Sequence, residues 1–397
     1  MTMADNKDKK VLNVPALRFP EFTDEWKEVL FASNLERLEN GATYNTNDKD
    51  GVPMSRIETI STGRIDYTKV GHCSTPQKIE HYIMRYGDIL FSHINSLKHI
   101  GKTAYYSAEE PLYHGMNLLL FRCKNNVDSK FFFFLINNTH FIRKCQILAK
   151  QAVNQASIST SDLKKIKVYI PDINEQSKIQ KFLSLIEKRI ELQNKIIEDL
   201  KKLKSALADK LYSSTKGETF SFRQLFDVVN ERNKKLTYSN VLSASQELGM
   251  IERSDINIDI KFEQDSISKY KIVRRGDYVV HLRSFQGGFA FSDRTGICSP
   301  AYTILRPHDM VVYGYLSYFF TSKPFIKSLK LVTYGIRDGR SINVEEWLDM
   351  TVTLPTKREQ SHILAIINAI DNKLHNENQI HNYMFRQRTY LLKTMFI

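Results

Sequence analysis

Two long stretches of this chain carry the same amphipathic pattern, and their repetition limits the possible folds more than any other feature. The first stretch runs from Pro171 to Tyr212 and the second from Pro355 to Phe396. Each position in the first stretch has a counterpart in the second, and the number of residues between counterparts is always the same as between Pro171 and Pro355. We call this constant spacing the repeat offset. Each stretch begins with Pro-x-x-x-Glu-Gln and continues with apolar residues at steps of three and four over about 38 residues, which predicts a helix roughly 57 Å long. A helix of that length must bury its apolar face against a second helix, so the sequence predicts a coiled coil.

The apolar face of each predicted helix can be written out residue by residue. The expected positions are Leu183, Ile186, Ile190, Ile196, Leu207 and Leu211 in the first helix, and Ile367, Ile370, Leu374, Ile380, Leu391 and Met395 in the second. Gln193 and Glu377 interrupt the two series at matching places, where they either set the register of the pair or face solvent at the edge of the apolar face. The pattern alone permits a parallel or an antiparallel pair, and we expect the antiparallel one.

Both helices are predicted to begin with a capping box. The boxes are Asp172 with Glu175 and Thr356 with Glu359. In such a box the first side chain accepts a hydrogen bond from a helix N–H group, and the glutamate reaches back to the N–H group of the cap residue. The proline before each box disfavours helix in the residue that precedes it, which places the start of each helix.

The segments before the two helices also resemble each other. Gly87-Asp88 and Gly276-Asp277 each precede a short apolar run, which predicts a turn that leads into a strand. The aromatic runs at 131–134 and 315–320 occupy equivalent places, and their continuous apolar character predicts buried helices rather than exposed base-stacking surfaces. The sequence therefore predicts an α+β protein with two tandem globular domains, each followed by a long helix.

The domain boundaries follow from these repeats. At the entry to the two domains we align Trp26 with Phe222, and Glu36-Arg37 with Glu231-Arg232. Residues 40–80 and 233–270 hardly resemble each other, so the two domains share a scaffold but differ in their loops. The predicted organisation is a disordered lead-in at 1–18, a first globular domain at 19–173, a long helix at 174–215, a second globular domain at 216–357 and a second long helix at 358–397.

The charge balance indicates a polyanionic partner. The chain has 57 Lys and Arg against 44 Asp and Glu, a formal net charge of +13, which favours nucleic acid ahead of an anionic membrane. Its four cysteines show no Cys-x-x-Cys spacing, so we expect neither a disulfide framework nor a metal site, and a reducing cytosol fits. No apolar run approaches the eighteen residues of a membrane span, so we expect no contact with a membrane.

No catalytic motif is complete in this sequence. Gly101-Lys102-Thr103 resembles the end of a phosphate-binding loop, but the position that should hold the first glycine is Ser96. Glu175 and Lys178 echo a nuclease core, yet their spacing is wrong and a helix cap explains Glu175 better. We therefore expect a non-catalytic chain without a cofactor, with a solitary nuclease and a coiled-coil scaffold unrelated to DNA as the alternatives.

Loops with side chains suited to reading DNA bases lie at matching positions before the two helices. Arginine can bind guanine through two hydrogen bonds, Asn and Gln can bind adenine, and apolar groups contact the thymine methyl. The candidate DNA-binding residues are Asn95, Lys98, His99, Lys102, Lys150, Gln151, Asn154 and Gln155 in the first domain, and Arg283, Gln286, Tyr334, Arg337 and Arg340 in the second. Any one of them could equally be an ordinary solvated side chain, but the group as a whole favours contact with DNA.

The chain resembles the specificity subunits of type I restriction–modification systems. The resemblance rests on the Arg-Phe-Pro-Glu-Phe entry at 18–22 with Trp26, the two Gly-Asp turns and the paired Pro-x-x-x-Glu-Gln helices. It implies two target-recognition domains, each reading one half of a bipartite asymmetric target in double-stranded DNA. It also implies helices that set the spacer and dock modification subunits, two of them expected, with restriction and translocase subunits in the full complex. Methylation and cleavage would then belong to those partners in the cytoplasm.

Overall fold

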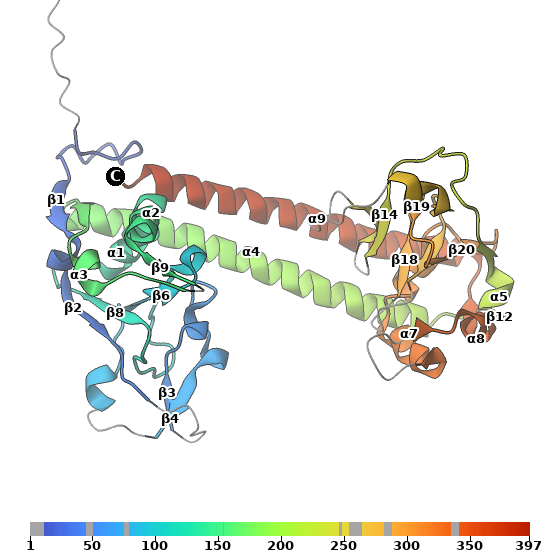
Figure 1. Ribbon diagram of the computed structural model, residues 1–397, viewed down its shortest axis with the longest axis horizontal. Helices are drawn as coiled ribbons and strands as arrows, with labels where there is room; N and C mark the ends of the chain where they lie inside the picture. Colours follow the sequence, from blue (N-terminus) through green and yellow to red (C-terminus); the bar gives the residue numbers. More distant parts are fainter. Residues whose placement is uncertain are drawn as a thin grey trace, which may run out of the picture. The chain divides into compact units, whose positions relative to one another are not determined.

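The computed structural model describes residues 12–44, 51–74, 79–153, 155–245, 248–253, 264–281, 288–334 and 341–397. The chain forms two compact units, and each unit contains one half of each long helix. Unit 1 comprises Met1–Gln193 and Ile380–Ile397, and unit 2 comprises Asn194–Gln379. The long helices are α4 (Ile173–Ser213) and α9 (Lys357–Thr394), drawn in green and red in Figure 1.

Unit 1 is built on a four-stranded antiparallel sheet in the order β2-β8-β5-β7. These strands are β2 (Leu35–Asn40), β8 (Leu119–Cys123), β5 (Ile89–Phe91) and β7 (Thr103–Tyr105). The smaller sheets pair β1 (Lys27–Leu30) with β11 (Lys167–Ile170), β3 (Val52–Met54) with β4 (Gly71–Cys73), and β6 (Ile94–Asn95) with β10 (Gln155–Ser157) and β9 (Lys150–Ala152). Its short helices are α1 (Ser129–Ile136), α2 (Thr139–Leu148) and α3 (Thr160–Lys164).

Unit 2 repeats this plan, with a four-stranded antiparallel sheet in the order β13-β20-β17-β18. These strands are β13 (Phe226–Val229), β20 (Thr303–Pro307), β17 (Tyr278–Val280) and β18 (Phe289–Phe291). The smaller sheets pair β12 (Glu218–Ser221) with β23 (Thr351–Leu354), β14 (Leu242–Ser245) with β15 (Gly249–Glu252), β16 (Lys271–Val273) with β19 (Gly296–Cys298), and β21 (Thr333–Tyr334) with β22 (Ser341–Ile342). Its short helices are α5 (Phe222–Leu225), α6 (Tyr315–Phe319), α7 (Lys323–Ser328) and α8 (Val344–Asp349). The predicted α+β repeat is confirmed.

The Gly-Asp turns predicted from the sequence are present in both units. Gly87 and Gly276 have φ of 91° and 99°, a left-handed conformation that favours glycine. The buried Asp88 side chain accepts a hydrogen bond from the Arg85 N–H group at 2.7 Å, and two from the Arg122 guanidinium at 2.8 and 2.7 Å. Asp277 is held in the same way in unit 2, by Arg274 and Arg306. Each turn is thus tied to the centre of its sheet.

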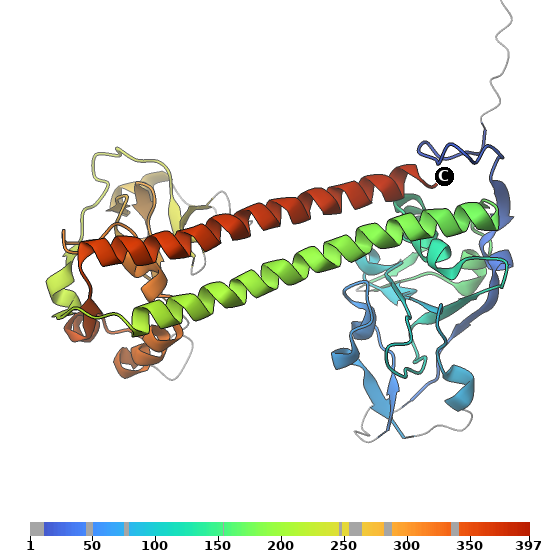
Figure 2. The same cartoon turned by 180° about the vertical axis from the view of Figure 1, so that it is seen from behind.

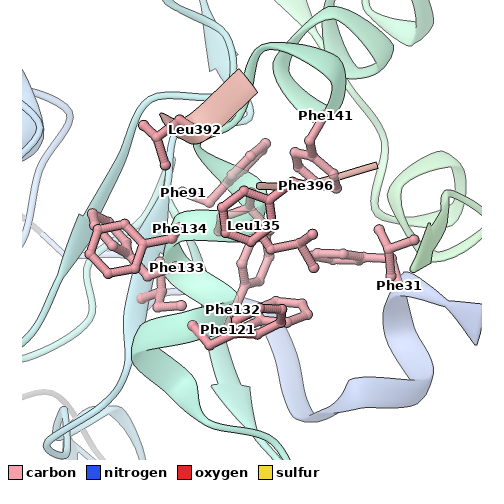
Figure 3. Packing of buried hydrophobic residues seen from close by; sticks show 14 of the residues in the cluster. Phe31, Phe91, Phe121, Phe132, Phe133, Phe134, Leu135, Phe141, Leu392 and Phe396 are labelled. Atoms are coloured by element: carbon pink, nitrogen blue, oxygen red, sulfur yellow. The ribbon is translucent and has the colours of Figure 1, made fainter. Parts of the chain in front are cut away.

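The core of unit 1 is rich in aromatic side chains. Phe131–Phe134 of α1 are at most 5% exposed, which confirms the prediction of a buried helix. Asp128 begins this helix by accepting hydrogen bonds from the N–H groups of Lys130 and Phe131. The close-up in Figure 3 shows Leu392 and Phe396, from the end of the chain, among these rings. The last residues of α9 are therefore part of the core of unit 1.

Within each unit, the halves of α4 and α9 lie side by side and run in opposite directions (Figure 2). In unit 1, Glu187 accepts a hydrogen bond from Arg388 at 2.9 Å, and Leu183 packs in the same cluster as Leu391. In unit 2, Lys204 Nζ lies 2.6 Å from Asp371 Oδ1. Each unit therefore holds its own parts of α4 and α9 in antiparallel contact.

The predicted apolar ladder is correct at its ends and wrong at one position in each helix. Ile196 and Ile380 are 45% and 40% exposed, whereas Ile197 is 7% exposed. The reason is the step length, since alternate steps of three and four lead from Ile190 through Gln193 to Ile197. Gln193 and Glu377 are each 6% exposed, so they belong to the buried face, and the interpretation that they face solvent is wrong.

The predicted capping box is complete in α9 but only half formed in α4. Thr356 N donates to Glu359 at 3.1 Å, and Glu359 N donates back to the Thr356 hydroxyl. At the start of α4, Asp172 does accept from the N–H group of Glu175, but the Glu175 carboxylate does not return to the cap. It accepts two 2.7 Å hydrogen bonds from the Arg18 guanidinium instead, because this charged partner provides a stronger contact than the backbone.

The entry segment explains why Arg18 lies there. The Leu17 N–H group donates to the Thr394 carbonyl at the end of α9, and the Phe19 ring packs edge-on against Phe182 of α4.

The glutamine of the repeated motif makes equivalent hydrogen bonds in both units. Gln176 donates to the Pro171 carbonyl and accepts from Asp128 N, and Gln360 donates to the Pro355 carbonyl and accepts from Val312 N. It therefore ties the start of each long helix to the loop before the aromatic helix.

The predicted alignment of the two domain entries is wrong. Strand β1 pairs Lys27 with Ile170, and strand β12 pairs Glu218 with Leu354, its repeat counterpart. The residue after each strand is therefore Phe31 in unit 1 and Phe222 in unit 2, so Trp26 is not the counterpart of Phe222. The alignment of Glu36-Arg37 with Glu231-Arg232 is wrong as well. Arg37 lies opposite Arg122 in unit 1, and Asp227 lies opposite Arg306, the repeat counterpart of Arg122, in unit 2. Asp227 is therefore the equivalent of Arg37. Similar spacings of aromatic and charged residues produced the false match.

Candidate nucleic-acid interface

A small three-stranded sheet in unit 1 gathers candidate residues that lie far apart in the sequence. The central strand β10 pairs with both β9 and β6, so that Ala156 lies opposite Gln151 on one side and Asn95 on the other. Ala156 is 2% exposed and anchors this sheet to the core of the unit. The pairing therefore brings Lys150, Gln151, Gln155 and Asn95 into one small sheet, with Gln151 and Asn95 on the face of Ala156 and Lys150 and Gln155 on the opposite face.

The outer face of this sheet is polar and open to solvent. Residues 155–158 alternate between exposed and buried positions, so that the side chains of Gln155 and Ser157 point outward. Lys150 and Gln151 of β9 are also exposed. Lys150 shares the outer face with Gln155 and Ser157, so this face offers an ammonium group and an amide group that can contact phosphates and base edges.

The candidate residues between Asn95 and Lys102 are held by hydrogen bonds within unit 1. The Asn95 side chain donates to the Ser92 hydroxyl at 3.2 Å and accepts from the Ser96 N–H group. Lys98 and His99 lie in a 3-10 helix (Leu97–His99), where Lys98 is exposed and His99 is half-buried. Lys102 donates through Nζ to the Ser61 carbonyl at 2.8 Å. Its ammonium group therefore braces a neighbouring loop of the unit.

His93 lies directly before β6 and is 8% exposed. Its carbonyl accepts a hydrogen bond from the Ile158 N–H group, which joins it to the end of β10. Burial away from water lowers the pKa of His93 to about 4, so the imidazole is neutral near pH 7. This side chain is buried and is therefore not placed to contact a ligand in solvent.

The equivalent hairpin of unit 2 has the same register at its base. Tyr334 lies opposite Ser341, as Lys150 lies opposite Ser157 in unit 1, and the repeat offset relates the two pairs. Tyr334 is 55% exposed and donates its hydroxyl to Glu346 at 2.6 Å. That hydrogen bond raises the pKa of Tyr334. The two units therefore present a hairpin at the same place in their folds.

Several predicted residues lie outside the part of the chain that the structure describes. They are Asn154, Arg283, Gln286, Arg337 and Arg340. All thirteen candidates remain predictions as DNA contacts.

The structure adds two exposed residues that the sequence analysis did not select. Val153 follows β9 and is 98% exposed, and Ser157 is exposed on β10. The alternation of polar and apolar residues in Gln-Ala-Ser-Ile at 155–158 signals the outward position of Ser157. Val153 had no signal, because exposure at the tip of a hairpin is not visible in the sequence.

A metal centre has no support among the described residues. No group of three or more His, Cys, Asp or Glu side chains in those ranges could hold a metal ion. Cys73, Cys145 and Cys298 are buried, and burial raises the pKa of Cys145 and Cys298 to about 12, so these two thiols stay protonated near pH 7. Across the described ranges, no helix has both the length and the apolar character that crossing a membrane requires.

Comparison with known proteins finds a family profile that matches the first half of the chain. The sequence profile described as "Type I restriction modification DNA specificity domain" matches residues 24–202. A Methanocaldococcus jannaschii protein named provisionally as the type I restriction enzyme MjaX specificity subunit is 42% identical over 211 residues, which is 51% of this chain and 49% of that protein. The MjaVIII specificity subunit of the same organism is 23% identical over 205 residues, 48% of this chain and 46% of that protein. The chain thus spans about half the length of the curated relatives it matches.

Solved structures extend the likeness of the fold to the whole chain. The S subunit of a type I restriction–modification system from M. genitalium superimposes with a TM-score of 0.55 at 14% identity, covering 97% of this chain and 99% of that one. A structure described as showing assembly and conformational transition of the type I R-M system gives a TM-score of 0.58 at 13% identity, over 92% of this chain and 96% of that one. Residues 24–202 match the profile of the type I specificity domain, and the solved structures show that the chain has the fold of type I specificity subunits.

Proposed function

We propose that this chain is the DNA-specificity subunit of a type I restriction–modification complex. Each of its two target-recognition domains, at 19–173 and 216–357, would read one half of an asymmetric bipartite target in double-stranded DNA. The chain would perform no chemistry itself. It would direct modification subunits, two of them by our expectation, and the restriction and translocase subunits of the full complex.

The observation that carries this proposal is the pair of equivalent hairpins with unlike side chains. Lys150 and Tyr334 hold the same register position in the two hairpins. The residues after them differ, with Gln151 to Gln155 in unit 1 and Gly335 to Arg340 in unit 2. A common scaffold that presents different hydrogen-bonding groups is what two different half-sites require. The net charge of +13 would supply contacts with phosphates and a strong dependence of affinity on salt.

The outer face of α4 supports docking of partner proteins. Leu185 and Leu192 in unit 1 are 63% and 52% exposed and lie seven residues apart. Ile196 and Leu203 in unit 2 are 45% and 48% exposed and are again seven residues apart. Seven residues return to the same face of a helix, so within each unit the two aliphatic side chains form a short apolar strip suited to another helix. We infer that modification subunits bind there.

A domain exchange tests the proposal. The chain is purified with the methyltransferase subunit of its own system, and methylated adenines are mapped by single-molecule sequencing of DNA treated with the complex. We expect an asymmetric target in two parts, and replacement of residues 216–354 by those of a relative should change one part only. If both half-sites stayed the same after the exchange, the assignment of the domains would be wrong.

Two alternatives give different outcomes in the same preparations. A solitary nuclease would cut DNA in the presence of Mg²⁺ without any other subunit. A scaffold unrelated to DNA would direct no methylation and would show no preference among sequences.

A further inference from the structure

One exposed aliphatic side chain occupies the same place in both units. Ile147 is 73% exposed and Leu331 is 75% exposed, and the repeat offset relates the two positions. The surrounding segments correspond in detail. Asn138 and Ser322 cap the helices α2 and α7 that precede them, and the paired strands after them share one register. Ile147 and Leu331 are therefore structural equivalents.

A cation precedes each of these side chains by four residues. Arg143 and Lys327 are both exposed, and no hydrogen bond or ion pair of either side chain occurs within the described ranges. Ile147 and Arg143 lie one turn apart on α2, and Leu331 follows Lys327 across the junction of α7 with a 3-10 helix (Leu329–Val332). Each unit therefore presents an aliphatic–cation pair, which we define as Arg143 with Ile147 in unit 1 and Lys327 with Leu331 in unit 2.

The aliphatic–cation pairs contrast with the hairpins that come after them. Side chains that read different half-sites must differ between the units, as those of the hairpins do. A surface that is alike in both units must contact something that is the same for both. Under the proposed function, the components common to both units are the DNA backbone and the two copies of the modification subunit.

The chemistry of the pairs favours the protein partner. The outside of the DNA backbone is polar and anionic, so it offers nothing that gains from contact with a leucine or isoleucine. A protein surface can bury the aliphatic side chain in an apolar pocket and place a carboxylate beside the cation. We propose that each aliphatic–cation pair docks one copy of the modification subunit, in addition to the contacts along α4. This inference rests on the proposed function and adds the recognition domains to the docking surface.

The test measures how many modification subunits bind, and how tightly. The probe is the methyltransferase subunit that supports methylation in the domain-exchange experiment, titrated against the full chain and followed by native mass spectrometry. Ile147→Asn should weaken one of the two binding steps and Leu331→Asn the other, each by roughly tenfold or more, because the burial of one aliphatic side chain is lost. The double variant should weaken both steps. Leu248→Asn is the matched control, since Leu248 is 71% exposed but lies in a region where the two units differ.

Charge reversal provides a second, independent set of variants. Arg143→Glu and Lys327→Glu should weaken the same steps as the neighbouring asparagine variants, and lower salt should enlarge the effect. Unchanged binding of both copies by all four variants would overturn the inference. Loss of DNA binding with intact assembly would overturn it too, and would assign the pairs to DNA. The proposed function fails separately, if the unaltered complex directs no methylation at a bipartite site.

Discussion

Removal of the Arg18 guanidinium should destabilise unit 1 while leaving unit 2 unaffected. The Glu175 side chain is 1% exposed and that of Arg18 is 12% exposed, and two 2.7 Å hydrogen bonds join them. The same guanidinium donates to the Asp24 carbonyl at 2.6 Å. Its hydrogen bond to Glu175 raises the pKa of Arg18, so the guanidinium stays charged. Arg18→Met therefore leaves a buried carboxylate without its counter-charge.

The expected loss in the free energy of unfolding can be estimated from the range that is typical of buried ion pairs. Breaking a buried pair by removal of one partner costs roughly 3–5 kcal/mol, and we expect about 3 kcal/mol because Arg18 keeps some contact with water. With a urea dependence of about 2 kcal/mol per molar, the unfolding midpoint of unit 1 should fall by roughly 1.5 M. Replacement of both partners, Arg18→Met with Glu175→Met, should restore most of the stability, because no charge is then buried alone.

The chain offers a reporter for each unit. It has two tryptophans, Trp26 in unit 1 and Trp347 in unit 2, and both are buried. In a Trp347→Phe background, Trp26 fluorescence during urea unfolding reports unit 1 alone, and the reverse background reports unit 2. Lys167→Met is the matched control, because the Lys167–Glu28 pair is exposed and its loss should cause no measurable shift. An Arg18→Met midpoint equal to that of the control would refute the reasoning.

Three further predictions concern the end of the chain, a buried imidazole and a reading loop. Phe396→Ala removes a ring that contacts Trp26, and should lower the stability of unit 1 by about 3–4 kcal/mol in the same fluorescence assay. Burial lowers the pKa of His93 to about 4, so unit 1 should lose stability as the pH falls from about 6.5 towards 4, and His93→Gln should reduce this loss. Arg337→Ala should relax sequence preference at one position of one half-site in methylation mapping, whereas uniform weakening over all sequences would indicate a phosphate contact.

The sequence predicted the parts of the fold that depend on local patterns. The helices α4 and α9, the left-handed turns at Gly87 and Gly276 and the buried aromatic helix were all visible, because each follows from the periodicity or chemistry of neighbouring residues. The exposure of Ile196 was mispredicted because a jump of six residues was accepted in a ladder that steps by three and four. Continuing the steps of three and four through the polar residue in the series would have led to Ile197.

The candidate site depended more on pairing over long distances. Asn95 and Gln151 come together only because β10 pairs with both of their strands, and no local pattern reveals this pairing. The same limit applies to Lys102, whose ammonium group is held by the carbonyl of Ser61, a residue distant in sequence. Residue types selected the candidate loops, which remain predictions, but the division between supporting and accessible side chains required the fold.

The division of α9 between the units affects the order in which a nascent chain can mature. Unit 2 is one continuous segment, whereas the core of unit 1 is completed by Leu392 and Phe396. Residues 12–193 therefore emerge from the ribosome long before the side chains that complete their core. Their apolar surface stays exposed to solvent while unit 2 is being synthesised. Chaperone binding during synthesis is expected to concentrate on the first half of the polypeptide.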